Sequence, residues 1–115
     1  MQFIYYPKCS TCIKAKKKLE SLEISVTLRD IVLENPTKEE LTSFYKKSNL
    51  PLKKFFNTSG LLYKEMNLKE KLPSMSEDEM LTLLSTNGKL IKRPLLVGDD
   101  FVLVGYKEDA YEKLV

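Results

Sequence analysis

Histidine and tryptophan are absent from this 115-residue chain, and cysteine occurs only twice. Without an imidazole the chain cannot form a Ser-His-Asp or Cys-His catalytic arrangement, a histidine metal site or a histidine-based pH switch. The acid, base or nucleophile of any reaction must therefore come from Cys, Lys, Asp, Glu, Tyr or the backbone.

Long apolar runs are also missing. No stretch approaches the roughly 18–20 apolar residues that a membrane-spanning helix needs, so we expect no membrane association. The start of the chain, residues 1–7, has neither a basic n-region nor an apolar h-region, which predicts no secretory signal and a cytoplasmic protein. In that compartment a closely spaced cysteine pair is typical of catalytic or redox-sensing chemistry.

The composition is that of a folded globular chain, with 43% hydrophobic and 30% charged residues. Its length predicts a single domain spanning residues 1–115. The net charge is only +3, from 19 basic and 16 acidic residues, and the one dense basic cluster is Lys14, Lys16, Lys17 and Lys18. That cluster is either a solvated helix face or a source of positive potential near the cysteines. We therefore expect a monomer that does not bind nucleic acid directly.

The first third of the chain predicts a strand, a helix and a second strand. Residues 2–6 form a short apolar and aromatic run that Pro7 ends, and residues 24–30 alternate weakly between apolar and polar. Between them, one helix face carries Cys12, Ala15, Leu19 and Leu22. This order predicts a right-handed βαβ unit with parallel strands.

The middle of the chain predicts helices. Thr37 with Glu40, and Ser76 with Glu79, have the spacing of capping boxes, and Asn87-Gly88 supplies a helix stop. Shorter helical pieces are expected at residues 52–56 and 61–68.

The C-terminal part returns to strands. Residues 95–97 and 101–104 predict a hairpin through Gly98-Asp99-Asp100, and residues 107–114 predict a last amphipathic helix. The predicted fold class is therefore α/β, a βαβ unit and a ββα unit with a helical insert between the second and third strands.

The cysteines lie where the first strand meets the first helix, in Pro7-Lys8-Cys9-Ser10-Thr11-Cys12. A helix N-terminus favours an anion and can lower a thiol pKa from about 8.5 toward roughly 3.5–7.5. Cys9 would then be the exposed nucleophile, and Cys12, one turn later, would resolve a mixed disulfide. Two buried cysteines at a chance spacing are the alternative. A zinc site is not expected, because it needs about four Cys or His ligands.

A second feature is Lys92-Arg93-Pro94, ahead of the third strand. Local sequence favours a trans Arg93–Pro94 bond, since only about 5–6% of X-Pro bonds are cis. Arg93 is either an ordinary surface charge or a partner for an anion or thiolate, because guanidinium is permanently charged and forked.

Five segments together resemble the ArsC/Spx family, which has a thioredoxin-like fold, and among its members the small arsenate-reductase-like proteins of Gram-positive bacteria. These segments are Tyr6-Pro7-Lys8-Cys9, Phe55-Phe56-Asn57-Thr58-Ser59-Gly60, residues 72–79, Ile91-Lys92-Arg93-Pro94 and Val104-Gly105-Tyr106-Lys107-Glu108-Asp109. The resemblance covers essentially the whole chain. It implies that Cys9 is the nucleophile, that Pro94 is a cis-proline facing the cysteines, and that Arg93 lies beside the site.

The chain differs from glutaredoxin-linked arsenate reductases at several of their characteristic positions. Cys12 stands where those enzymes usually have serine, and Ile13 where they have arginine. Asn57 and Tyr106 align with two further arginines, which leaves Arg93 alone from the oxyanion-binding set. One guanidinium holds a tetrahedral arsenate poorly compared with several charge-assisted hydrogen bonds.

Spx-type regulators share the cysteine pair, Arg93-Pro94 and Gly105-Tyr106 with this chain. The resemblance to them implies redox sensing and binding to the RNA polymerase α subunit, although Pro51 lies near the position of a glycine used in that contact.

We therefore predict a thiol–disulfide oxidoreductase or redox sensor that alternates between free thiols and a Cys9–Cys12 disulfide. Arg93 would stabilise negative charge near Cys9. Pro94, Ser10, Thr11 and Asn57 would shape the substrate face. No bound cofactor or metal is expected. The partners would be a protein disulfide and an external thiol reductant, either glutathione with glutaredoxin or thioredoxin. The alternatives are an Spx-like regulator that binds the RNA polymerase α subunit and a thiol-dependent arsenate reductase.

Overall fold

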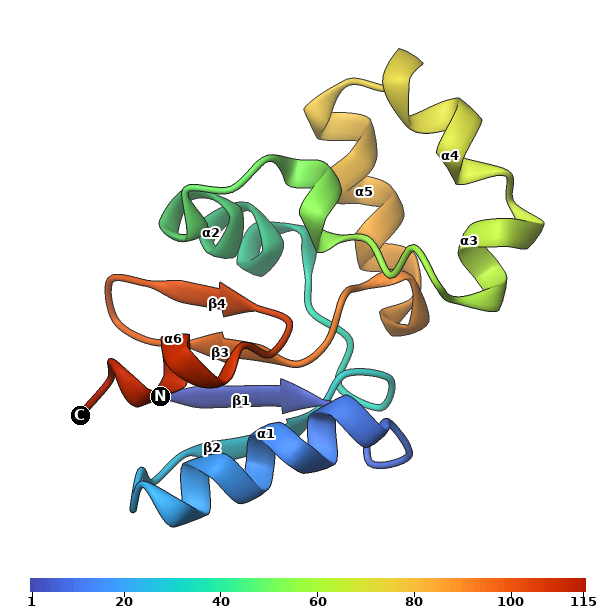
Figure 1. Cartoon of the computed structure of the whole chain (residues 1–115). Coiled ribbons are helices and arrows are strands. Elements are labelled where there is room, and N and C mark those ends of the chain that lie inside the picture. The colour runs from blue at the N-terminus through green and yellow to red at the C-terminus, as the bar shows by residue number, and fades with distance from the viewer.

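A mixed sheet of four strands forms the centre of the molecule in a computed structural model that describes all residues, 1–115 (Figure 1). The strands are β1 (Gln2–Tyr5), β2 (Thr27–Asp30), β3 (Leu95–Val97) and β4 (Val102–Val104). Their order across the sheet is β2-β1-β3-β4. The β1–β2 pair is parallel, and the other two pairs are antiparallel. The predicted βαβ unit and C-terminal hairpin are both confirmed.

Helices cover both faces of this sheet. One face carries α1 (Ser10–Ser21) and α6 (Glu108–Glu112), whose buried side chains Ala15, Leu19 and Tyr111 pack with Phe3 and Leu96. The other face carries the insert. Its helix α2 (Lys38–Ser48) packs against β4, α5 (Glu77–Thr86) packs against α2, and α3 (Leu61–Glu65) and α4 (Leu68–Lys71) lie farther from the sheet (Figure 1). Short 3₁₀ turns lie at Leu52–Phe55, Leu72–Ser74 and Gly88–Leu90. The α/β fold class with a helical insert between β2 and β3 is confirmed.

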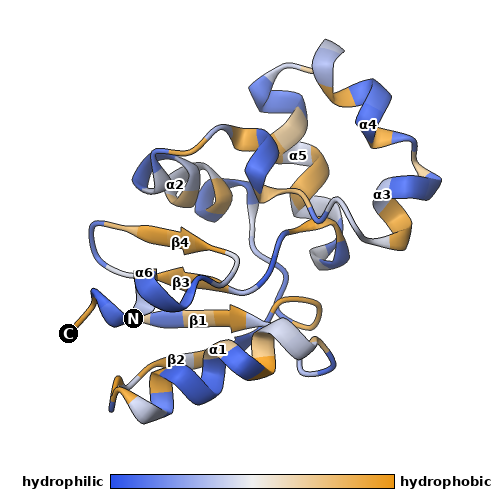
Figure 2. Cartoon of the chain, in the orientation of Figure 1, coloured by the Kyte–Doolittle hydropathy of each residue, from blue (hydrophilic) through white to orange (hydrophobic).

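The strand residues divide between the two faces as a pleated sheet requires. Phe3 and Leu96 belong to the smaller core cluster, whereas Ile4, Leu95 and Val97 belong to the larger one. Because both faces are covered, the central strands are apolar on both sides, and hydrophobic colour is concentrated on them (Figure 2).

Both capping boxes form. Thr37 Oγ1 accepts a hydrogen bond from the Glu40 N–H at 3.1 Å, and the Glu40 carboxylate accepts one from the Thr37 N–H at 3.0 Å. Ser76 and Glu79 repeat the arrangement at the start of α5, at 3.1 and 2.9 Å. These reciprocal bonds satisfy N–H groups that the first turn of a helix leaves free.

The second strand is shorter than the predicted range 24–30. β1 begins at Gln2, which is paired with Thr27, so residues before Thr27 have no strand beside them to pair with. Leu28, one of the apolar residues of that alternation, is 45% exposed, and β2 lies at the edge of the sheet. The alternation therefore predicted the strand but not its length.

The predicted helix stop at Asn87-Gly88 is confirmed, since α5 ends at Thr86. The glycine is required for close packing, because a Cβ on Gly88 would lie 1.9 Å from the carbonyl oxygen of Ile31. None of the helices has the length and apolar character needed to cross a bilayer.

Candidate active site

Cys9 is the N-cap residue of α1. Its backbone is extended, with φ −90° and ψ 119°, and its Sγ accepts a hydrogen bond from the Cys12 N–H at 3.4 Å. The Cys9 N–H donates to the carbonyl oxygen of Tyr6 at 3.0 Å, which closes the turn between β1 and α1. The sulfur therefore takes the place that a Ser or Asp oxygen occupies in an ordinary helix cap.

The pKa values of the two thiols are shifted in opposite directions. Partial burial by itself raises the pKa of Cys9, but the Cys12 backbone N–H and the nearby Arg93 guanidinium lower it by more, so the pKa lies below its ordinary value of 9.0. Cys12 is fully buried, and burial together with the adjacent Cys9 raises its pKa to about 12. Both cysteines are free thiols. Cys9 is thus the thiol that ionises first.

Arg93 reaches the site from the turn before β3. Its Cζ lies 4.9 Å from the centre of the Tyr6 ring, within the range of a cation–π contact. Its Nη1 is buried and has no hydrogen-bond partner. A buried N–H donor without an acceptor lowers the stability of the fold, so this nitrogen is available to an acceptor atom of a bound group.

The Arg93–Pro94 bond is cis, so the trans bond predicted from local sequence is wrong, and the cis-proline implied by the resemblance is present. The local preference for trans is only about 0.5–1 kcal/mol. Backbone hydrogen bonds from Lys92 N–H to the Phe55 carbonyl, 2.7 Å, and from Gly105 N–H to the Pro94 carbonyl, 2.9 Å, hold the chain on either side. Contacts between distant parts of the chain can outweigh so small a preference.

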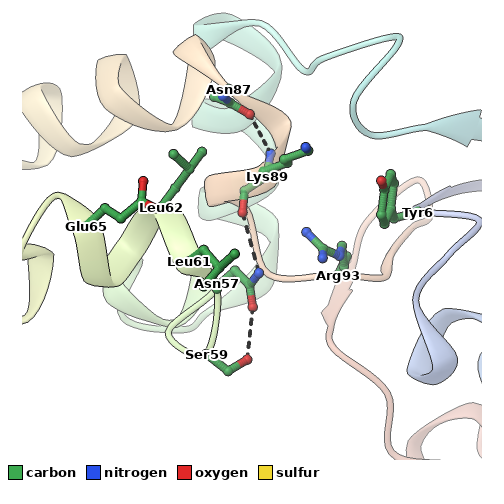
Figure 3. Close-up of a pocket in the computed structure, with 10 residues that line it drawn as sticks. Tyr6, Asn57, Ser59, Leu61, Leu62, Glu65, Asn87, Lys89 and Arg93 are labelled. Atoms are coloured by element: carbon green, nitrogen blue, oxygen red, sulfur yellow. Dashed lines mark hydrogen bonds between the residues drawn. The ribbon is translucent and has the colours of Figure 1, made fainter.

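A cleft of about 570 Å³ opens beside Arg93 (Figure 3). Tyr6 and Arg93 form one side, and the helical insert forms the other through Asn57 and the start of α3. The Asn57 N–H donates to the Leu90 carbonyl at 2.8 Å, and its Nδ2 donates to the Lys89 carbonyl at 3.4 Å. The cleft is thus bounded by segments that are far apart in the sequence.

The structure brings Cys9, Cys12 and Arg93 together, and it places Asn57 in the cleft that Arg93 lines. Pro94 is buried next to Arg93, whereas Ser10 and Thr11 are exposed in the first turn of α1 and do not line the cleft. Tyr106, aligned with an arginine, lies elsewhere, edge-on to Tyr111 at 4.9 Å between ring centres.

Sequence reasoning named Asn57 and Arg93 and missed the other residues that line the cleft, among them Tyr6 and Lys89. Tyr6 carries a usable signal, because it is an aromatic residue directly before Pro7-Lys8-Cys9. Lys89 carries none, since it is one of many lysines, and only the fold shows that it lines the same cleft as Arg93 (Figure 3).

A half-buried thiol that caps a helix, near an arginine that precedes a cis-proline, on this sheet defines a protein with a thioredoxin-like fold. The chain belongs to the ArsC family, whose family model matches residues 4–114.

Two relatives align with nearly the whole chain. YusI of Bacillus subtilis, described as uncharacterized, is 55% identical over 113 residues, which are 98% of this chain and 96% of the relative. The regulatory protein MgsR of B. subtilis is 31% identical over 114 residues, which are 99% and 89% of the two chains.

Solved structures agree with the fold. An ArsC-family-related protein of Bacteroides fragilis is 57% identical, with a TM-score of 0.97 over 99% of this chain and 96% of its own. A possible arsenate reductase of Streptococcus mutans is 45% identical, with a TM-score of 0.90 over 98% and 95%.

Proposed function

We propose that the chain is a thiol–disulfide oxidoreductase or redox sensor that works through Cys9 and Cys12. The supporting observation is the contrast between the two thiols. The Cys9 sulfur has a lowered pKa at the helix N-terminus beside Arg93, and Cys12 is buried behind it with a raised pKa. This arrangement suits one thiol to attack first and the other to act only after an adduct has formed.

In the first step the Cys9 thiolate attacks one sulfur of a substrate disulfide. A new S–S bond forms to Cys9, the old S–S bond breaks, and the other substrate sulfur leaves as a thiolate. Arg93 stabilises the thiolate charge before the attack, because its guanidinium lies near enough to Cys9 to lower the pKa of that thiol.

In the second step Cys12 loses its proton and attacks the Cys9 sulfur. The Cys9–Cys12 bond forms, and the second substrate sulfur leaves as a thiolate that takes up a proton. The substrate gains two electrons and the cysteine pair loses two. An external thiol, glutathione with glutaredoxin or thioredoxin, must reduce the disulfide to restore the starting state.

Two cysteine variants test this sequence of steps. Mixed with a model protein disulfide, Cys12→Ser should accumulate a covalent adduct on Cys9, because no thiol remains to release it. Cys9→Ser should form no adduct, and the unaltered chain should end two hydrogens lighter by intact mass spectrometry. Equal adduct formation by both single variants would disprove the assignment of roles.

A regulatory role is the second candidate, and the similarity to MgsR along nearly the whole chain favours it. The Cys9–Cys12 pair would then sense oxidation, and the partner would be the RNA polymerase α subunit. Purified α subunit should bind with different affinity to the reduced and the oxidised chain. Failure to bind in either state would eliminate this role and leave the reductase untouched.

Arsenate reduction is the third candidate, supported by the similarity to the S. mutans protein. Arg93 and Asn57 are the residues of the cleft that would hold the oxyanion. Turnover of arsenate with either reductant supplied is the test, and its absence with both would close the question.

A further inference from the structure

The helical insert contains a second cleft, of about 550 Å³, which shares no lining residue with the cleft beside Arg93. Its walls come from the Leu52–Phe55 turn, α3, α4, the Leu72–Ser74 turn with Met75, and α5, which lie together away from β2 (Figure 1). Its volume falls within the roughly 300–1,000 Å³ of clefts that hold small molecules. The redox chemistry proposed above makes no use of it.

The charge of this cleft is one-sided. Lys53, Lys54 and Lys69 line it, no acidic residue does, and none of the three lysines forms an ion pair or a side-chain hydrogen bond. A concave surface with cations of one sign concentrates anions.

The acidic side chains on the neighbouring helices are engaged elsewhere. Asp78 pairs with Lys38 at 2.7 Å. Three others accept hydrogen bonds from groups outside the cleft, Glu70 from Asn67, Glu77 from the Tyr45 hydroxyl and Glu79 from the Ser76 N–H. Glu65 of α3 lines the cleft beside Arg93 and not this one. The three lysines are thus left without counter-charges from the protein.

The rest of the cleft is apolar and adaptable. Met75 and Met80 are half-buried in its wall, and methionine side chains adjust to the shape of a bound group. The Tyr63 ring also lines the cleft, and it makes a tilted contact with Phe56, with 6.4 Å between ring centres and 57° between planes. An aromatic ring in the wall of a cleft offers an apolar surface to a planar group.

We propose that this lysine cleft, formed by Lys53, Lys54, Lys69, Tyr63, Met75 and Met80, binds a small anion with a planar apolar body. The lysines recognise the phosphate, sulfonate or carboxylate group, and the tyrosine and methionines cover the body. The net charge of +3 and the confined volume favour a small ligand over a nucleic acid or an acidic protein.

The probe for the test is 8-anilinonaphthalene-1-sulfonate, titrated into the folded, reduced chain. Its fluorescence should rise to saturation with one site per chain, and the amide NMR signals of Tyr63, Lys69 and Met80 should shift. The variant Lys53→Gln/Lys54→Gln/Lys69→Gln should bind about tenfold more weakly, which is about 1.4 kcal/mol. Tyr63→Leu keeps every charge and should also weaken binding.

The matched control is Lys46→Gln/Lys64→Gln/Lys71→Gln, which removes three exposed lysines of the same insert that do not line the cleft. It should bind the probe like the unaltered chain. Equal weakening in both triple variants, or shifts centred on Arg93, would overturn the proposal. Tighter binding of an acidic peptide than of the sulfonate, with shifts spread beyond the cleft, would overturn it in favour of a protein partner. None of these outcomes would change the expected results of the cysteine variants.

Discussion

The chain has only two arginines, and their surroundings differ sharply. Arg29, on β2, has its whole guanidinium engaged. Nη1 and Nη2 reach the two carboxylate oxygens of Glu40 at 2.6 and 2.9 Å. Nε donates to the Glu34 carbonyl at 2.8 Å, and Nη1 also donates to the Gln2 side chain at 3.2 Å. This group ties the edge of the sheet to the start of α2.

Arg93 contrasts with this arrangement. One of its nitrogens is buried without an acceptor, and its charge faces a thiol, an aromatic ring and a cleft. The two arginines therefore differ in whether every guanidinium nitrogen has an acceptor, and this difference distinguishes a structural arginine from one available to a ligand or thiolate. A fully paired guanidinium stabilises the fold, whereas one held in place and left partly unpaired can respond to an anion or a thiolate.

The largest expected effect is on the rate of thiol alkylation, and it tests whether Cys9, the thiol near Arg93, is the reactive one. In Cys9→Ser the remaining thiol, Cys12, is buried with a pKa raised to about 12. Its alkylation by iodoacetamide at neutral pH should be about 100-fold slower than that of Cys9 in Cys12→Ser, because the thiolate is the nucleophile. Comparable rates would show that the environments of the two cysteines do not differ as the structure indicates.

The next largest effect tests whether the charge of Arg93 lowers the pKa of Cys9. Arg93→Met keeps much of the side-chain volume and removes the charge, so the Cys9 pKa should rise toward 9.0. The alkylation rate at neutral pH should fall about 3- to 10-fold, as expected for up to one pKa unit. A pH–rate profile of alkylation measures this.

Arg93→Lys is the control, since it retains a positive charge and should keep part of the lowered pKa. The thermal midpoint should hardly change in either variant. A large loss of stability with an unchanged Cys9 profile would place Arg93 in the same class as Arg29.

The reverse pattern is expected at Arg29. Arg29→Met or Glu40→Gln should lower the free energy of unfolding by about 1–2 kcal/mol, a figure that allows for the partial exposure of both side chains. The double variant should lose less than the sum, because both single changes remove the same ion pair. Urea unfolding measures the loss. Cys9 alkylation should stay unchanged, and a shifted profile would mean that the two regions are coupled.

The smallest effect is a pH dependence. Hydrogen bonds from Arg29 lower the pKa of Glu40 from 4.5 to about 2 in the folded chain. The resulting stabilisation is fully present above about pH 4.5 and is lost as the pH falls toward 2. In Arg29→Met the loss across that window should be smaller. Identical acid unfolding curves, once aligned for overall stability, would contradict this.

The sequence predicted those parts of the fold that depend on neighbours along the chain. The capping boxes at Thr37 and Ser76 and the hairpin between β3 and β4 follow from short-range spacing, and the structure confirms them. The length of β2 was not predictable, because β1 sets the number of paired residues. The exposure of Leu28 was not predictable either, because it depends on the place of β2 at the edge of the sheet.

The residues of the candidate site can likewise be divided into those that the sequence predicted and those that only the fold brings together. The place of Cys9 before a helix is a local feature, and so is Arg93 as a candidate partner for an anion or thiolate. The resemblance to a family supplied Asn57, the place of Arg93 beside the site and the cis Pro94. Lys89 in the cleft and the lysine cleft of the insert arise only when distant segments meet.

The sequence by itself determined where redox chemistry can occur. It has two cysteines, no histidine, and a strand-to-helix junction that puts Cys9 at a helix N-terminus. Only the tertiary structure decided how the two thiols differ and which arginine is free. Burial separates the pKa values of Cys9 and Cys12, and Glu40 satisfies Arg29 while Nη1 of Arg93 is left without an acceptor. Acidity and hydrogen-bond saturation depend on what surrounds a group in space, which short-range spacing along a chain does not specify.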